Sequence, residues 1–252
     1  MTRFGALIAG LALAGGMAHA GTPLPAGYGG GFLPPTATDS KTELKVSKNL
    51  SKLSGSVNKC HTKGVTNVLK SKPDGVAACD LNAFNKYVIT ANKLALTAAA
   101  CINGPAQAAL GGTVAGLVAS FDPTIWCDGT TPLPAGFAGG FQPTTAATFK
   151  AESLVAKALI KHSAAVTKCA SKGVTNLVKG AGVGGPDGGL NVCLNDPAKG
   201  ATTKTNASLA KIVGIPTCLA TNPLATANTV TALTLAFNPQ VFCASPSGAF
   251  LN

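Results

Sequence analysis

The sequence is poor in arginine and in aromatic residues. Its single arginine, Arg3, lies within the first twenty residues, and only 5% of the 252 residues are aromatic. Arginine and aromatic rings are the side chains that read base edges and stack on single-stranded nucleic acid. Their scarcity argues against base-specific recognition. It also leaves Ala, Val, Leu and Gly to fill the interior, which favours closely packed helices.

Enzyme motifs are lacking as well. The chain contains no Ser/His/Asp order, no G-x-S-x-G and no metal-ligand cluster. Gly180, Gly182 and Gly185 satisfy G-x-G-x-x-G, but no predicted strand precedes them, so we expect no nucleotide site there. We therefore expect no catalytic residue, no bound metal, no cofactor and no small-molecule substrate.

The first twenty residues have the pattern of a secretory signal peptide. Arg3 precedes an apolar run from Phe4 to about Ala14, and Ala18-His19-Ala20 places small residues at a cleavage site. The run is shorter than the roughly 20 apolar residues of a membrane span. We expect residues 1–20 to be removed and the mature protein to be secreted or periplasmic. The mature chain then carries 19 lysines and nine carboxylates.

The rest of the chain reads as a tandem duplication. The segment Lys59–Lys70 returns 109 residues later as Lys168–Lys179, and Thr22–Gly27 returns as Thr131–Gly136. We divide the chain into unit 1, residues 21–130, and unit 2, residues 131–252, each long enough for a core of its own. Each unit opens with a Pro/Gly-rich arm. We expect each arm to pack on its own bundle, with contacts to neighbouring molecules as the alternative.

After each arm the sequence predicts an amphipathic helix of about 30 residues with a stripe of lysines. Six lysines in each unit are spaced 7, 4, 7, 4 and 7 residues apart. At about 100° per residue, these steps keep all six ammonium groups within a stripe about 60° wide, and the apolar residues fall opposite. The stripes are Lys41, Lys48, Lys52, Lys59, Lys63 and Lys70 in unit 1, and Lys150, Lys157, Lys161, Lys168, Lys172 and Lys179 in unit 2.

These stripes have two interpretations. Each is either the solvated back of a bundle helix or an anion-binding surface. Most solvated helices mix charges of both signs, because like charges four residues apart destabilise a helix by a few tenths of a kcal/mol. No carboxylate falls within either stripe. Because this like-charge pattern is present in both units, we consider anion binding as well as simple solvation.

Further helices are predicted at about 77–98 and 106–120 in unit 1, and at about 198–213 and 223–236 in unit 2. The second of each pair is almost free of charge. We expect these uncharged helices to be buried between neighbours rather than inserted in a membrane. The predicted fold is therefore all-α, a tandem duplication of a disulfide-stapled three- to four-helix bundle joined by Pro/Gly-rich arms.

Eight cysteines, four in each unit, indicate disulfides in an exported protein. Four cysteines allow three pairings, so the sequence leaves the connectivity open. In an up-down bundle the end of the third helix returns beside the start of the second. We therefore favour Cys79 with Cys127, Cys60 with Cys101, Cys193 with Cys243, and Cys169 with Cys218.

Several residues at corresponding positions point to structure rather than chemistry. Glu43 and Glu152 each follow the first stripe lysine, and we interpret them as helix-capping residues, with Ser40 and Glu43 forming a capping box. Asp122 corresponds to Asn238, which would abolish acid–base chemistry but keep a turn. Gly64 and Gly173 lie inside the long helical pattern, which indicates that another backbone packs close there or that the helix kinks.

Together these features predict an exported, non-enzymatic, cationic binding protein. Its expected partners are an anionic polysaccharide, lipid head groups, or extracellular nucleic acid bound without sequence preference. The first alternative is a structural protein that self-associates at the cell surface or outside the cell. The second is an enzyme whose site forms only on folding.

Overall fold

The computed structural model describes residues 22–180, 185–220 and 223–244, and this part of the chain is helical. It contains no strand, only the isolated bridges between Pro23 and Phe32 and between Pro132 and Phe141. The predicted all-α class is confirmed. The predicted signal peptide, residues 1–20, lies outside the described residues, as does Gly182 of the glycine motif.

The helices of unit 1 begin with a rod of 33 residues, α1, followed by two shorter helices and a terminal turn. Their bounds are α1 Ala37–Leu69, α2 Val76–Ala95, the 3-10 turn η1 Ala100–Ile102, α3 Gly104–Ser120 and α4 Asp122–Ile125. Unit 2 begins with an equally long α5, and its second helix is divided in two. Its bounds are α5 Ala146–Val178, α6 Leu190–Asn195, α7 Ala201–Leu209, α8 Thr217–Ala220, α9 Pro223–Leu235 and α10 Asn238–Val241.

Threonines cap the two long helices. The Thr36 side chain accepts a hydrogen bond from the Asp39 N–H, and the Thr145 side chain accepts one from the Thr148 N–H. The predicted capping box of Ser40 with Glu43 is therefore wrong. The helix begins one turn earlier than the sequence pattern suggested, which places Glu43 in the second turn.

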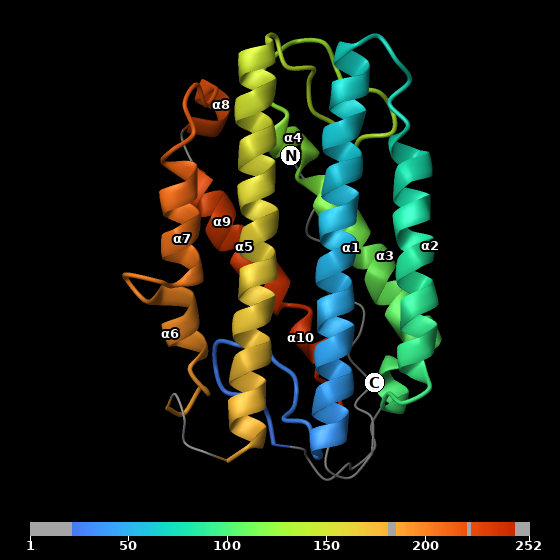
Figure 1. Cartoon of the computed structure of the whole chain (residues 1–252), viewed down its shortest axis with the longest axis vertical. Helices are drawn as coiled ribbons and strands as arrows, with labels where there is room; N and C mark the ends of the chain where they lie inside the picture. The colour runs from blue at the N-terminus through green and yellow to red at the C-terminus, as the bar shows by residue number, and fades with distance from the viewer. Residues whose placement is uncertain (1–21, 181–184, 221–222, 245–252) are drawn as a thin grey trace, which may run out of the picture.

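The two long helices lie side by side and antiparallel at the centre of the molecule (Figure 1). In the same view α2 flanks α1, α6 and α7 flank α5, and α3 and α9 lie behind. α1 packs on α2 and α3, and α5 packs on α7 and α9. One layer therefore carries the charged helices, and the uncharged α3 and α9 form the layer behind it.

The hydrophobic core joins the two units. One cluster combines Val46 and Val57 of unit 1 with Val174 and Phe242 of unit 2, and the other cluster mixes the units in the same way. The expectation that each unit has a core of its own is therefore wrong. Small side chains let α1 and α5 approach closely, so their buried faces share one interior.

Each arm packs on the opposite unit. The Tyr28 hydroxyl donates to the Asp187 carbonyl at 2.9 Å, and the Asn238 amide donates to the Tyr28 carbonyl at 2.7 Å. In the second arm the Phe141 N–H donates to the Trp126 carbonyl at 2.8 Å. The expectation that each arm packs on its own bundle is therefore wrong.

The glycines inside the long helices receive the aromatic rings of these arms. A Cβ on Gly173 would collide with the Tyr28 hydroxyl, and a Cβ on Gly64 would collide with Val76 and lie 2.8 Å from Phe137. Side chains rather than another backbone make the closest contacts at Gly64 and Gly173, and α1 and α5 each run unbroken through their glycine, so the helices do not kink there.

All eight cysteines form disulfides, but the predicted pairing is wrong. The observed pairs are Cys60 with Cys79, Cys169 with Cys193, Cys101 with Cys243, and Cys127 with Cys218. The first two tie each long helix to the helix that follows it, and the last two join the units. The predicted pairing was wrong because it assumed that each unit folds independently of the other. Four disulfides are consistent with an oxidising extracellular or periplasmic environment.

The segment Gly104–Ile125, which contains α3, is long and apolar enough to cross a membrane by composition alone. Only 28% of its most apolar window is buried. Leu110, Gly111 and Val114 form its inner face. The expected burial between neighbours therefore holds for one face of α3 and not for the whole helix.

Candidate anion-binding face

All twelve stripe lysines are exposed. They lie on α1 and α5 or, for Lys70 and Lys179, at the C-cap that directly follows each helix. Val46, Leu53 and Val57 on the opposite side of α1 are buried. The 7 and 4 spacing thus produces, on an unbroken α-helix, the single charged stripe expected from its period.

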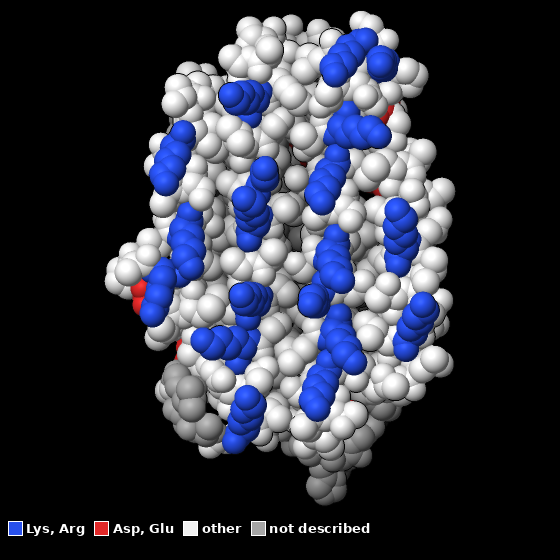
Figure 2. All heavy atoms as spheres, in the orientation of Figure 1, with Lys and Arg blue, Asp and Glu red and all other residues white. Residues whose placement is uncertain are grey.

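Both stripes lie on the same face of the molecule. Figure 2 shows rows of lysine over α1 and α5, with further lysines over α2 and around α7. Steps of four and seven residues separate neighbouring lysines by roughly 6 and 10 Å along each helix. These spacings are close to the Debye length of about 8 Å at physiological salt, so neighbouring charges reinforce one another's field.

No described lysine forms an ion pair with a carboxylate, although Asp196 interacts electrostatically with Lys199 and Lys204. Among the described residues the only ion pairs are those of His61 with Asp80 and Asp122. All nine Asp and Glu residues are buried or half-buried, whereas all 19 described lysines are exposed. All nine accept hydrogen bonds from the protein's own groups, and those of Asp39, Asp128 and Asp196 lie at the surface. The lysine face is therefore strongly positive, with acidic side chains only at its margins (Figure 2).

Glu43 and Glu152 illustrate this use of carboxylates. Glu43 is 1% exposed and accepts a hydrogen bond from the Ala244 N–H at 3.1 Å; Glu152 is 0% exposed and accepts from the Cys127 and Asp128 N–H groups at 3.0 and 2.9 Å. Each glutamate thereby holds the C-terminal corner of the opposite unit. The predicted capping role is wrong.

Burial sets the protonation of these two carboxyls. It raises the pKa of Glu43 to about 8 and that of Glu152 to about 7, although the backbone N–H groups oppose the shift. In each residue the second oxygen, Oε2, is buried without a hydrogen-bond partner. A proton on that oxygen removes a buried negative charge, so near neutral pH both glutamates are partly uncharged.

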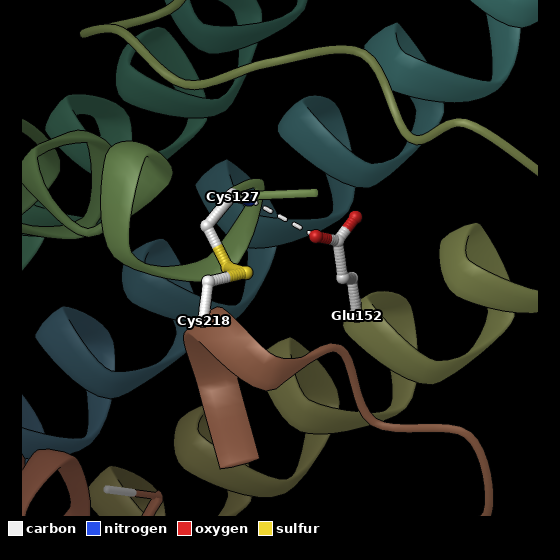
Figure 3. A group of neighbouring side chains, drawn as sticks. All are labelled: Cys127, Glu152 and Cys218. Atoms are coloured by element: carbon white, nitrogen blue, oxygen red, sulfur yellow. Dashed lines mark hydrogen bonds between the residues drawn. A yellow bond between two sulfur atoms is a disulfide. The ribbon is translucent and has the colours of Figure 1, made fainter. Parts of the chain in front are cut away.

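Glu152 also lies beside the disulfide of Cys127 and Cys218 (Figure 3). One carboxylate oxygen and the two sulfur atoms lie within 4.8 Å of one another. Two cysteines and a carboxylate are a plausible ligand set for a metal, but the sulfurs here are bonded to each other. Because metals bind thiolates, the oxidised pair does not supply that set.

A second buried polar cluster surrounds His61. Its Nδ1 lies 2.7 Å from Asp122 Oδ2, its Nε2 lies 3.0 Å from Asp80 Oδ2, and its ring meets Phe137 edge-on. Burial lowers the pKa of His61, but the hydrogen bonds to Asp122 and Asp80 outweigh it and raise the pKa to about 9. The imidazolium thus joins α1, α2 and α4 through two charge-assisted bonds.

Unit 2 replaces this cluster with uncharged residues. Ala170, Leu194 and Asn238 stand at the positions of His61, Asp80 and Asp122. The other described histidine, His162, lies elsewhere on α5 and is held between the Thr205 and Thr231 hydroxyls at 2.8 and 2.6 Å. Burial lowers the pKa of His162. The two histidines therefore have different structural roles.

Comparisons with protein families, with curated proteins and with solved structures give no match to this chain. The arguments about function therefore rest on the geometry alone. The structure brings the predicted stripe lysines together on one face. Sequence reasoning missed the His61 cluster and the burial of Glu43 and Glu152. The matching positions of the two glutamates were the only available signal, and they were equally compatible with capping.

Proposed function

We propose that this is an exported, non-enzymatic cationic protein whose lysine face binds an anionic polymer or anionic lipid head groups by charge density. The observation that carries the proposal is the segregation of charge, with every described lysine exposed and every described carboxylate buried or half-buried. A merely soluble surface gains from mixed signs. A surface of one sign raises the local concentration of polyanions and speeds their association.

The residue types favour contact through charge rather than recognition of a particular shape. Lysine is a compact point charge without the planar fork with which arginine binds phosphate or carboxylate bidentately. The part of the chain after residue 20 contains no arginine. We therefore include anionic polysaccharide, lipid head groups and extracellular nucleic acid as partners, bound without sequence preference through release of counterions.

We also infer that the two units are copies of one disulfide-stapled bundle with a Pro/Gly arm. The copying places one stripe on each of two antiparallel helices and doubles the width of the face. The wider face supports binding to an extended anionic surface, because a single stripe would contact the ligand only along one narrow line.

Lysine variants test the proposal. Changing the six stripe lysines of α1 to glutamine should greatly weaken retention on immobilised heparin and on vesicles that contain anionic phospholipid, and the same change on α5 should have a similar effect. Changing the same residues to arginine keeps the charge and should keep retention. Equal retention by the glutamine and wild-type proteins would contradict the proposal.

The structural alternative is self-association. The arms offer little support for it, because Tyr28 and Phe137 are buried against the protein's own helices. Sedimentation velocity at rising concentration separates the two functions. Self-association that persists in the glutamine variants would favour an assembly role, and a monomer that binds heparin would favour the proposal.

A further inference from the structure

The lysine face contains a hollow of about 360 Å³ between α5 and α7. Three exposed lysines from the two helices, Lys157, Lys161 and Lys204, line it together with apolar side chains that include Leu154, Ala158 and Ile212. Figure 2 shows lysines beside α5's row on the side where α7 lies. We call this feature the α5–α7 hollow. Its volume falls in the usual range for small-molecule sites, about 300–1,000 Å³.

Unit 2 differs from unit 1 in two features next to this hollow. Ala158 stands where unit 1 has Asn49, and the Asn49 amide bridges α1 to α2 by donating to the Tyr87 carbonyl at 3.2 Å. An alanine methyl cannot make that bridge. In addition, unit 1 has one continuous helix, α2, whereas a turn at 196–200 separates α6 from α7. The Asp196 side chain stabilises this turn by accepting from the Ala198 and Lys199 N–H groups at 2.8 Å.

The chemistry of the lining selects a ligand with both a charge and an apolar part. No carboxylate lines the hollow, and none of its three lysines is in an ion pair among the described residues, although Asp196 interacts electrostatically with Lys204. Three lysines that line one hollow suit a phosphate, which lysine binds as a point charge. The apolar walls suit a hydrocarbon chain, which a soluble polyanion such as heparin does not supply.

We propose that the α5–α7 hollow binds an alkyl phosphate, with the phosphate at Lys157, Lys161 and Lys204 and the first methylenes of the chain against Leu154, Ala158 and Ile212. The inference rests on the proposed function and deepens it. In this proposal the α5–α7 hollow binds the phosphate head group of a single-chain lipid specifically. The rest of the lysine face binds anions by charge density.

Calorimetric titration with dodecyl phosphate below its micelle concentration tests the inference. Octyl phosphate, inorganic phosphate and the uncharged dodecyl maltoside serve as comparisons. Burying each methylene should strengthen binding by roughly fourfold, so alkyl phosphates should bind much more tightly than inorganic phosphate. Equal affinity for inorganic and alkyl phosphate would show a free-phosphate site and overturn the proposal. Binding of dodecyl maltoside as tight as that of dodecyl phosphate would overturn it too.

The duplication supplies a matched control for the charges. Changing Lys157, Lys161 and Lys204 to glutamine should weaken dodecyl phosphate binding at least tenfold. The corresponding unit 1 change, Lys48, Lys52 and Lys86 to glutamine, removes equal charge from the same face but should leave this binding within about twofold. Equal losses in the two triple variants would mean that only the general field matters, and would overturn the proposal.

A cavity-filling variant separates this site from the proposed function. Ala158→Leu should weaken dodecyl phosphate binding while heparin retention stays unchanged, because it adds volume and removes no charge. If Ala158→Leu binds dodecyl phosphate as the wild type does, the hollow is not the site. If the lysine-to-glutamine variants are retained on heparin as strongly as the wild type, the proposed function fails. The alkyl phosphate titration still tests the hollow independently of that result.

Discussion

The side chain of Glu152, in the second turn of α5, accepts a hydrogen bond at 3.0 Å from the backbone N–H of Cys127, at the end of the other unit. Glu43 and Ala244 form the matching contact at 3.1 Å. These buried carboxyls hold the two units together beside the disulfides that join them. They also make the stability of the junction depend on pH.

We predict that Glu152→Gln flattens the decrease of stability with pH between about 4.5 and 7. The pKa of Glu152 is raised from 4.5 to about 7 in the folded protein, so the fold holds the proton more tightly than the unfolded chain does. The resulting stabilisation is complete below pH 4.5 and is lost as pH rises through 7. It is on the order of 1–3 kcal/mol, or several degrees in Tm.

Thermal unfolding followed by circular dichroism across pH 4 to 8 measures this effect. Glu43→Gln is the companion variant and should flatten the profile up to about pH 8, where its own pKa lies. If Tm of the wild type rises between pH 5 and 7 while the glutamine variants are flat, the assigned direction of the shift is wrong.

For the His61 cluster we predict that a triple substitution lowers the stability of the protein less than a single substitution does. His61→Ala leaves the buried Asp122 carboxylate without its imidazolium and should destabilise the protein by about 3–5 kcal/mol. The triple change His61→Ala, Asp80→Leu and Asp122→Asn copies Ala170, Leu194 and Asn238 of unit 2. It should restore most of that loss, because no buried charge is left unpaired.

Denaturant unfolding of the two variants provides the comparison. In the wild type the stabilisation from His61 is full below pH 6.5 and is lost as pH rises through about 9, because the folded state raises this pKa. The triple variant should lack this alkaline loss. A triple variant less stable than His61→Ala would show that the cluster does more than balance charge.

The disulfide pattern predicts that the units stay joined after the chain is cut between them. Cys101–Cys243 and Cys127–Cys218 both connect unit 1 with unit 2. A protease site inserted near residue 130 should therefore give one band on a non-reducing gel and two after reduction. Replacing Cys127 and Cys218 together by serine should destabilise the protein by about 2–5 kcal/mol. Two separate fragments without reductant would contradict the observed pairing.

The helix glycines allow a paired test of the arm packing. Gly173→Ala should destabilise the protein by about 1–3 kcal/mol, because its Cβ would collide with the Tyr28 hydroxyl. Gly55→Ala is the control, since no atom outside its own helix lies within 4 Å of its Cβ, and it should stabilise α1 by up to about 1 kcal/mol. Adding Tyr28→Phe to Gly173→Ala should recover part of the loss. Equal effects of the two alanine changes in thermal unfolding would contradict the packing of this arm.

Periodic features of the chain could be predicted from its sequence, and long-range partners could not. The 7 and 4 spacing of the lysines determines their common face once a helix forms, so the stripes follow from local geometry. The cysteine partners depend on where α1 meets α5, and no local rule specifies that two similar units will exchange arms and share a core. Asp80 and Asp122 lie 19 and 61 residues from His61 in the sequence, so local patterns could not predict their cluster either.

The most direct test of the lysine face is the salt dependence of its affinity for heparin. A plot of the logarithm of the binding constant against the logarithm of salt concentration should be steep in the wild type, because each neutralised anionic group releases counterions. Replacing the six α1 stripe lysines, Lys41, Lys48, Lys52, Lys59, Lys63 and Lys70, by glutamine should make the slope markedly shallower. A shallow slope in the wild type, or an unchanged slope in the variant, would contradict binding by charge density.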